Sequence, residues 1–196
     1  MNFTALLGAL AFTTVLALAT AGETPPPAGW ILAGSAPQSY EIGTAPDGGR
    51  SRGPAGFIRA KETPPLKNGF GTLMQMFKAG DYQGKRVRFS AAVRTEKVAN
   101  WAGLWMRVDG NQREVLAFDN MQTRPIKGTS DWQRHEVVLD VAPNAEAIGI
   151  GVLVNGPGAA WLDEVRFEIV PKTIATTAAA SSAAVRAPQN LDFSQR

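Results

Sequence analysis

The sequence predicts an all-β fold, an antiparallel β-sandwich of the jelly-roll type. Apolar and polar residues alternate with a period of two along most of the chain, which is the pattern of half-buried strands. Glycine, proline, asparagine and aspartate separate these segments, and no amphipathic helix longer than a turn or two is visible. Strands that follow one another without helices between them are typical of antiparallel sandwiches.

The predicted strands are short, and their alternation assigns each side chain to a face. They span residues 30–34, 38–42, 56–60, 71–78, 85–95, 101–109, 115–120, 133–141, 147–155 and 160–170. Side chains two positions apart share one side of a strand. The apolar sides of the two strands at 85–95 and 101–109 are therefore expected in the core, and they comprise Val87, Phe89, Ala91, Val93, Ala102, Leu104, Met106 and Val108.

The opposite side of residues 101–109 carries Trp101, Trp105 and Arg107, which we interpret as a binding face. Aromatic planes pack on the apolar faces of sugar rings, and planar polar groups bind hydroxyl groups, with charged groups making the stronger hydrogen bonds. The candidate ligand-binding residues are Trp101, Trp105, Arg107, Gln75, Arg94, Asp119 and Asn120.

Two of these assignments leave alternatives open. Trp105 either contributes to the binding face or packs beneath the loop 120–131 with its N–H bonded. Gln75 lies in a segment whose two sides are both partly apolar, and it joins the binding face if Met74 and Met76 pack inward.

The chain divides into five segments. Residues 1–21 have the pattern of a signal peptide, since an uncharged apolar run ends in Ala19-Thr20-Ala21. We expect cleavage after Ala21 and an exported chain, periplasmic or secreted, without a transmembrane segment after cleavage; an uncleaved anchor is the alternative. A proline-rich segment (22–29), the sandwich (30–170), a linker rich in alanine, serine and threonine (171–188) and a tail (189–196) follow.

Composition argues against several classes of function. The chain contains no cysteine, which excludes disulfides and thiolate chemistry. Its 20 basic and 17 acidic residues are interleaved, which does not predict nucleic-acid binding. His135 is the only histidine, and neither a Gly-x-Ser-x-Gly nor a His-Glu-x-x-His motif occurs. We therefore do not expect an enzyme; a glycoside hydrolase would require two carboxylates facing each other across a groove.

The two ends of the predicted sandwich resemble a known family. Trp30-Ile-Leu-Ala-Gly-Ser opens it and Ala160-Trp-Leu-Asp-Glu-Val-Arg-Phe167 closes it, and both are similar to segments of the galactose-binding-like β-sandwich found in many carbohydrate-binding modules. The resemblance implies a jelly-roll sandwich, an aromatic ligand face and a structural calcium ion involving Asp163, with no other cofactor. A salt-bridged edge strand is the alternative interpretation of Asp163 and Glu164.

The tail shows one departure from this family. Such modules usually open with a short strand of the form Asn-Leu-x-Phe, and here that pattern occurs at the other end, in residues 190–193. We expect the tail to fold back and supply the first strand. A tail that pairs with a neighbouring molecule, or that stays unstructured, is the alternative.

Together these features predict an exported, non-catalytic carbohydrate-binding domain whose partner is a glycan. The alternative is an envelope protein of the same fold that holds a protein partner through the same face or through the tail.

Overall fold

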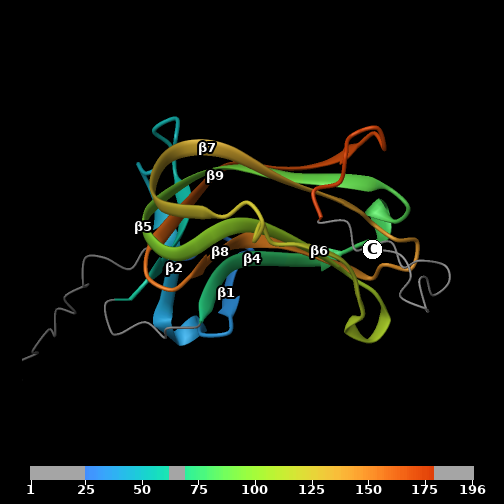
Figure 1. Ribbon diagram of the computed structural model, residues 1–196, viewed down its shortest axis with the longest axis horizontal. Helices are drawn as coiled ribbons and strands as arrows, with labels where there is room; N and C mark the ends of the chain where they lie inside the picture. Colours follow the sequence, from blue (N-terminus) through green and yellow to red (C-terminus); the bar gives the residue numbers. More distant parts are fainter. Residues whose placement is uncertain (1–24, 62–68, 179–196) are drawn as a thin grey trace, which may run out of the picture.

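The computed structural model describes residues 25–61 and 69–178, and it confirms the predicted antiparallel β-sandwich. The described part has two packed layers of strands (Figure 1). The strands are β1 (Ile31–Gly34), β2 (Tyr40–Ala45), β3 (Ala55–Ala60), β4 (Phe70–Lys78), β5 (Arg86–Asp109), β6 (Val115–Asp119), β7 (Ile126–Asp140), β8 (Ala147–Asn155) and β9 (Ala159–Val170).

Strand β5 belongs to both layers. Its first part, residues 86–96, pairs with β7 and β9, and its last part, residues 101–109, pairs with β6 and β8. One layer therefore has the order β7-β5-β9-β3-β2, and the other has the order β6-β5-β8-β4-β1. We call them the upper and the lower layer, after their places in Figure 1.

The bend in β5 is made by irregular pairing rather than by a loop. The register with β7 shifts three times between Val93 and Ala102, and Lys97 adopts a left-handed backbone conformation with φ 51°. Such irregularities bend and twist a strand. The two strands predicted at 85–95 and 101–109 are for this reason one continuous strand.

The core lies between the layers and contains the side chains that alternation assigned to it. Val87, Phe89, Ala91 and Val93 from the upper layer are fully buried. Ala102, Leu104, Met106 and Val108 from the lower layer are fully buried as well. The period-two pattern thus predicted correctly which side of each half of β5 faces inward.

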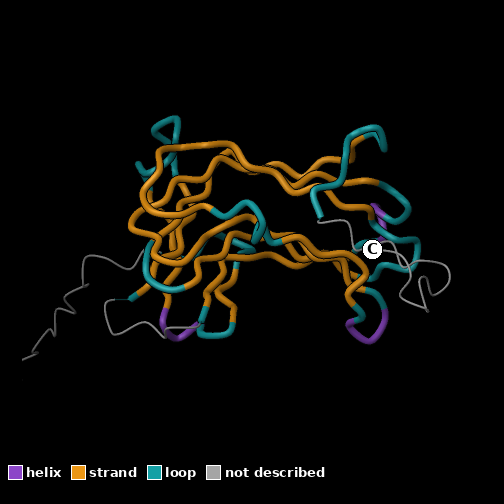
Figure 2. The backbone as a smooth tube through the Cα atoms, viewed as in Figure 1, coloured by secondary structure: helices purple, strands orange, loops and turns teal. Residues whose placement is uncertain are grey.

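Several boundaries differ from the prediction. Residues 37–39 form a 3-10 helix, η1 (Pro37–Ser39), so β2 begins only at Tyr40. Strand β7 begins at Ile126 instead of residue 133, because it follows β5 around the bend (Figure 2). The other short helices are η2 (Gly80–Tyr82) and η3 (Asn111–Arg113). No helix within 25–61 and 69–178 is long and apolar enough to cross a membrane.

One side of the sandwich has strand edges that no described strand pairs with. The pairing of β9 with β3 ends at Leu162, so residues 163–170 of β9 have no partner on that edge among the described strands. The pairing of β4 with β1 ends at Met74, which leaves residues 75–78 of β4 in the same situation. Beyond these points, the space between the layers is filled by Phe77, Tyr82 and Phe167, whose rings meet edge to face. The predicted signal peptide (1–21) and the predicted tail strand (190–193) lie outside the residues that the structure describes.

Candidate functional site

The outer face of the lower layer carries a groove of about 420 Å³. Strands β1, β4, β5, β6 and β8 all contribute to it. Its lining comprises Ala33, Gly34, Phe70, Thr72, Met74, Met76, Trp101, Trp105, Arg107, Phe118, Asn120 and Leu153. Four of the candidate residues therefore lie together in this groove: Trp101, Trp105, Arg107 and Asn120. Alternation along residues 101–109 predicts this for the first three, and Asn120 follows directly after β6.

Trp105 forms the floor of this groove. Its indole lies across Gly149 and Gly151 of β8, where a Cβ atom would come within 3.2 Å and 2.8 Å of ring atoms. The indole N–H donates a 2.7 Å hydrogen bond to Thr72 Oγ1, which itself donates to the Val152 carbonyl at 2.9 Å. Trp105 is only 8% exposed, so it is a fixed platform and not a projecting ring.

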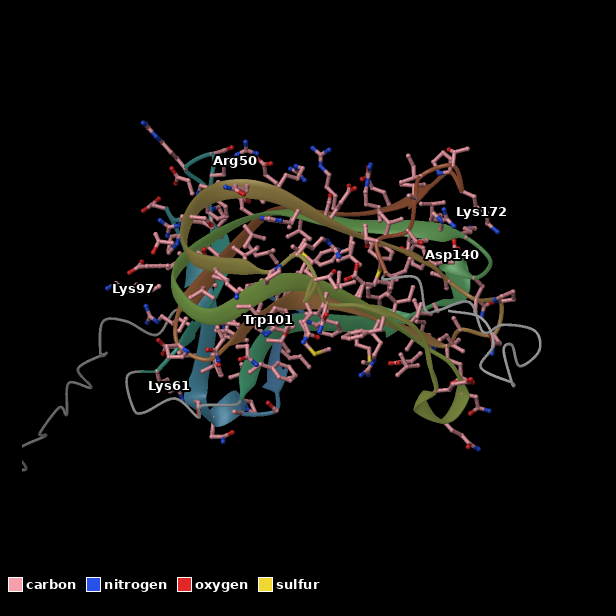
Figure 3. All side chains as sticks on the ribbon, in the orientation of Figure 1. Arg50, Lys61, Lys97, Trp101, Asp140 and Lys172 are labelled. Atoms are coloured by element: carbon pink, nitrogen blue, oxygen red, sulfur yellow. The ribbon has the colours of Figure 1, made fainter. Side chains whose placement is uncertain are left out.

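Apolar side chains extend this floor toward the edges of the groove. Met74, Trp105 and Leu153 form one buried cluster, and the partly buried Phe70 and Trp101 pack against it. Met76 and Phe118 are 53% and 46% exposed. Trp101, at the centre of Figure 3, lies at the start of the lower-layer part of β5. The groove thus offers a broad apolar surface that includes several aromatic rings.

Arg107 supplies the positive charge of the groove. Its guanidinium donates to Asp109 Oδ2 from Nε at 3.1 Å and from Nη2 at 3.0 Å, and Nε lies 2.8 Å from Oδ1. Asp109 is buried and Arg107 is partly exposed. An ion pair that fixes a guanidinium at the border of a groove orients its remaining N–H groups, which suits recognition of hydroxyl or carboxylate oxygens.

Asn120 provides an amide at the β6 side of the groove. Its Oδ1 accepts a 3.1 Å hydrogen bond from the Gln122 backbone N–H, which orients the side chain. The amide nitrogen then remains as a donor for a ligand.

Gln75 does not belong to this groove, so its predicted place on the binding face was wrong. Met74 and Met76 line the groove, and alternation therefore directs Gln75 to the inner side, beside Trp30, Phe77 and Ile150. The order of apolar and polar residues in β4 did not distinguish its two sides, and only the packing partners did.

Arg94 lies on the upper layer, away from the groove. Its guanidinium carbon is 4.2 Å from the ring centre of Trp161 and 5.8 Å from that of Trp132. The prediction that Arg94 shares a face with Arg107 was wrong because β5 passes from one layer to the other between the two residues.

Asp119 points toward the interior and stabilises the fold. Its carboxylate accepts hydrogen bonds from both terminal nitrogens of Arg124 (2.7 and 3.1 Å), from the Thr177 hydroxyl (2.6 Å) and from the Met121 N–H (2.9 Å). Burial by itself raises the pKa of Asp119, but these donors outweigh it and hold the pKa below its ordinary value. The prediction that Asp119 contributes to the ligand face was therefore wrong.

The Asp163 carboxylate accepts two hydrogen bonds from backbone N–H groups. Its Oδ2 accepts the Arg50 backbone N–H at 2.8 Å, and Oδ1 accepts the Glu164 N–H at 2.6 Å. Glu164 itself pairs with the guanidinium groups of Arg50 and Arg134. Calcium prefers six or more oxygen ligands, and residues 25–61 and 69–178 contain no group of three or more metal-binding side chains. Asp163 thus lies beside a salt-bridged Glu164. The structural calcium ion that the family resemblance implies stays a prediction.

Sequence reasoning missed several residues of the groove. Thr72, Met74, Met76, Phe70 and Phe118 come from strands whose alternation is ambiguous or whose neighbours are not evident from the sequence. The outward position of Leu153 was predictable from the sequence, because Leu153 alternates with the inward residues Val152 and Val154.

Comparison with known proteins gives one match in sequence and several in structure. No family model matches the chain. An uncharacterised HTH-type transcriptional regulator, YbfP, from Bacillus subtilis (strain 168) is 41% identical over 149 residues, which are 76% of this chain and 50% of the regulator. The chain thus spans about half the length of the curated relative that it matches.

This match involves the sandwich. Residues 1–24, 62–68 and 179–196 hold 49 residues, so at least 100 of the 149 matched positions lie in the described part. The helices there are three residues long. The shared portion is therefore chiefly β-structure and differs from a helix-turn-helix unit.

Two solved structures show the same fold. A xylan-binding domain from carbohydrate-binding module family 22 has a TM-score of 0.55 at 10% identity, covering 72% of this chain and 87% of the domain. The first family 22 xylan-binding domain of Xyn10C from Paenibacillus barcinonensis has a TM-score of 0.52 at 11% identity, covering 76% of this chain and 90% of the domain. The chain thus has the β-sandwich fold of these two domains.

Proposed function

We propose that this chain is an exported, non-catalytic carbohydrate-binding domain that holds a glycan in the groove of the lower layer. The observation that carries the proposal is the combination of an aromatic wall at Trp101, a flat apolar floor centred on Trp105 and an oriented cation at Arg107. A sugar ring presents an apolar face to such a floor and oxygen atoms to such a cation.

The lining of the groove supports binding without catalysis. Among the described residues that line it, none is an aspartate, glutamate, histidine or cysteine. Hydrolysis of a glycosidic bond generally uses two carboxyl groups that flank the bond. The nearby carboxylate of Asp109 is engaged by Arg107.

The comparisons support a binding domain that occurs in different proteins. Two neighbours with this fold are xylan-binding domains, and oligosaccharides of xylan are the first ligand class to test. In the sequence relative the matching segment makes up half of the regulator, which is consistent with a module that recognises a ligand in different protein contexts. The signal-peptide pattern of residues 1–21 is the basis for proposing export.

Calorimetric titration of the mature chain with neutral hexasaccharides of xylose, glucose, mannose and galactose tests this proposal. We expect saturable binding of at least one, with at least a tenfold loss of affinity, about 1.4 kcal/mol, in Trp101→Ala. Trp132→Ala is the matched control, because Trp132 lies on the upper layer beside Arg94 and its removal leaves the groove intact.

Absence of saturable binding with every glycan would contradict the proposal. It would favour a protein partner, for which the exposed apolar side chains of Met76 and Phe118 at the groove would supply the contact surface.

A further inference from the structure

The outer face of the upper layer carries a row of aromatic and cationic side chains. The strand registers pair Phe57 of β3 with Trp161 of β9, and Trp161 with Arg94 of β5. Trp132 of β7 completes the row on the far side of Arg94. The Arg94 guanidinium stacks on Trp161 at 4.2 Å, which holds this indole in place on the sheet.

A hollow of about 510 Å³ lies directly beside this row. Next to the row, Ala159 of β9 pairs with Arg59 of β3 on one side and with Glu96 of β5 on the other. The small side chain of Ala159 leaves space between the side chains of Arg59 and Glu96. Trp161 forms one wall of the hollow. The complete lining is Arg59, Ala60, Lys61, Glu96, Lys97, Pro157, Gly158, Ala159 and Trp161.

The backbone around this hollow is tightly fixed. Gly158 has φ +126°, and a Cβ atom there would come within 2.6 Å of Val98 Cα and 2.8 Å of the Lys97 carbonyl oxygen. Hydrogen bonds of 2.9 Å join the Ala60 N–H to the Gly158 carbonyl and the Ala99 N–H to the Pro157 carbonyl. The turn between β8 and β9 is therefore seated against the bend of β5, where Lys97 has its left-handed conformation.

Positive charge predominates in the described lining of the hollow. Arg59, Lys61 and Lys97 face one carboxylate, Glu96, which lies 3.9 Å from the Lys97 ammonium. Arg59 pairs through Nε with Glu41 on the neighbouring strand, and its guanidinium carbon lies 5.0 Å from the ring centre of Phe57. Lys61 and Lys97 project at the same end of the molecule, at the left of Figure 3.

We infer that this hollow is a second binding site, which takes a sugar bearing a carboxylate, that is, a hexuronate residue of an acidic glycan. The indole of Trp161 would pack on the ring of the sugar, and the cluster of Arg59, Lys61 and Lys97 would bind its carboxylate. The groove of the lower layer lies on the opposite layer and has a mainly apolar lining. The two sites therefore differ in chemistry and act independently.

Calorimetric titration with hexagalacturonate, with a glucuronic-acid oligosaccharide and with their carboxyl-reduced neutral counterparts tests the inference. We expect the mature chain to bind at least one acidic oligosaccharide, and to bind it less tightly as salt is raised. Lys97→Glu and Trp161→Ala should each weaken this binding at least tenfold. Trp101→Ala should leave it unchanged while weakening neutral glycan binding in the lower groove at least tenfold.

Lys97→Glu keeps the experiment decisive if Trp161→Ala fails to fold, because the Lys97 side chain is 85% exposed. Three results would overturn the inference: no binding of either acidic oligosaccharide, loss of acidic binding in Trp101→Ala instead of Lys97→Glu, or equal binding of dextran sulfate that does not depend on Trp161. If the proposal for the lower groove is wrong, the parent chain will not bind the neutral glycans, and this result is separate from the binding of acidic oligosaccharides.

Discussion

Replacing Thr72 by valine tests whether the groove floor depends on one buried hydrogen-bonding side chain. The Thr72 hydroxyl accepts the Trp105 indole N–H at 2.7 Å and donates to the Val152 carbonyl at 2.9 Å. Thr72 and Trp105 are 3% and 8% exposed. Valine keeps nearly the same shape but removes both hydrogen bonds, so the indole N–H loses its partner in a place that water hardly reaches.

The expected loss in the free energy of unfolding follows from these two contacts. A buried donor left without a partner costs about 1–3 kcal/mol, and a lost hydrogen bond to a carbonyl costs about 1 kcal/mol. The total is about 2–4 kcal/mol. For a domain of this size, that corresponds to a fall in Tm of about 5–15 °C.

Thermal unfolding followed by circular dichroism measures this effect, with Thr72→Ser as the matched control. Serine keeps the hydroxyl and loses one methyl group, so it should cost only about 1 kcal/mol. Equal Tm values for Thr72→Val and the parent chain would refute the reasoning. That result would mean that the Trp105 N–H finds another partner and that Thr72 does not hold the floor in place.

Three further predictions concern packing, pH and the tail. Gly151→Ala should lower Tm and weaken glycan binding, because its Cβ atom would come within 2.5 Å of the Leu73 carbonyl oxygen and 2.8 Å of the Trp105 indole nitrogen; an unchanged Tm would contradict this steric argument. Burial, and secondarily the charge of Arg124, lower the pKa of His135 in the folded protein. The contribution of His135 to stability is therefore fully present above the pKa of the unfolded chain, about 6.5. It is lost as pH falls through the lower pKa of the folded state. His135→Gln should therefore show a smaller drop in Tm between neutral and mildly acidic pH than the parent, and parallel curves would argue against it. Deleting residues 191–196 should lower Tm by about 2–4 °C for each 1 kcal/mol that a docked strand contributes. The edges of β4 and β9 with which no described strand pairs offer the tail a place; identical melting curves would exclude docking.

The alternation of apolar and polar residues within a strand predicted which side of that strand is buried. The buried side of each half of β5 was predictable because period-two patterning records which side chains avoid water. The same pattern placed Trp101, Trp105 and Arg107 on the other side, and the groove lies there. A strand with two partly apolar sides, such as β4, gives no such signal, and Gln75 was misplaced for that reason.

The sequence by itself determined an all-β chain, the inward side of its clearly alternating strands and the side on which two tryptophans and an arginine lie. These properties follow from local chemistry, since each strand must bury its apolar side. Only the tertiary structure decided that β5 serves both layers, and hence that Arg94 and Arg107 lie on opposite faces. The pairing of strands far apart in the chain brings Trp105 over Gly149 and Gly151, and no pattern within a single strand records which partner it will meet.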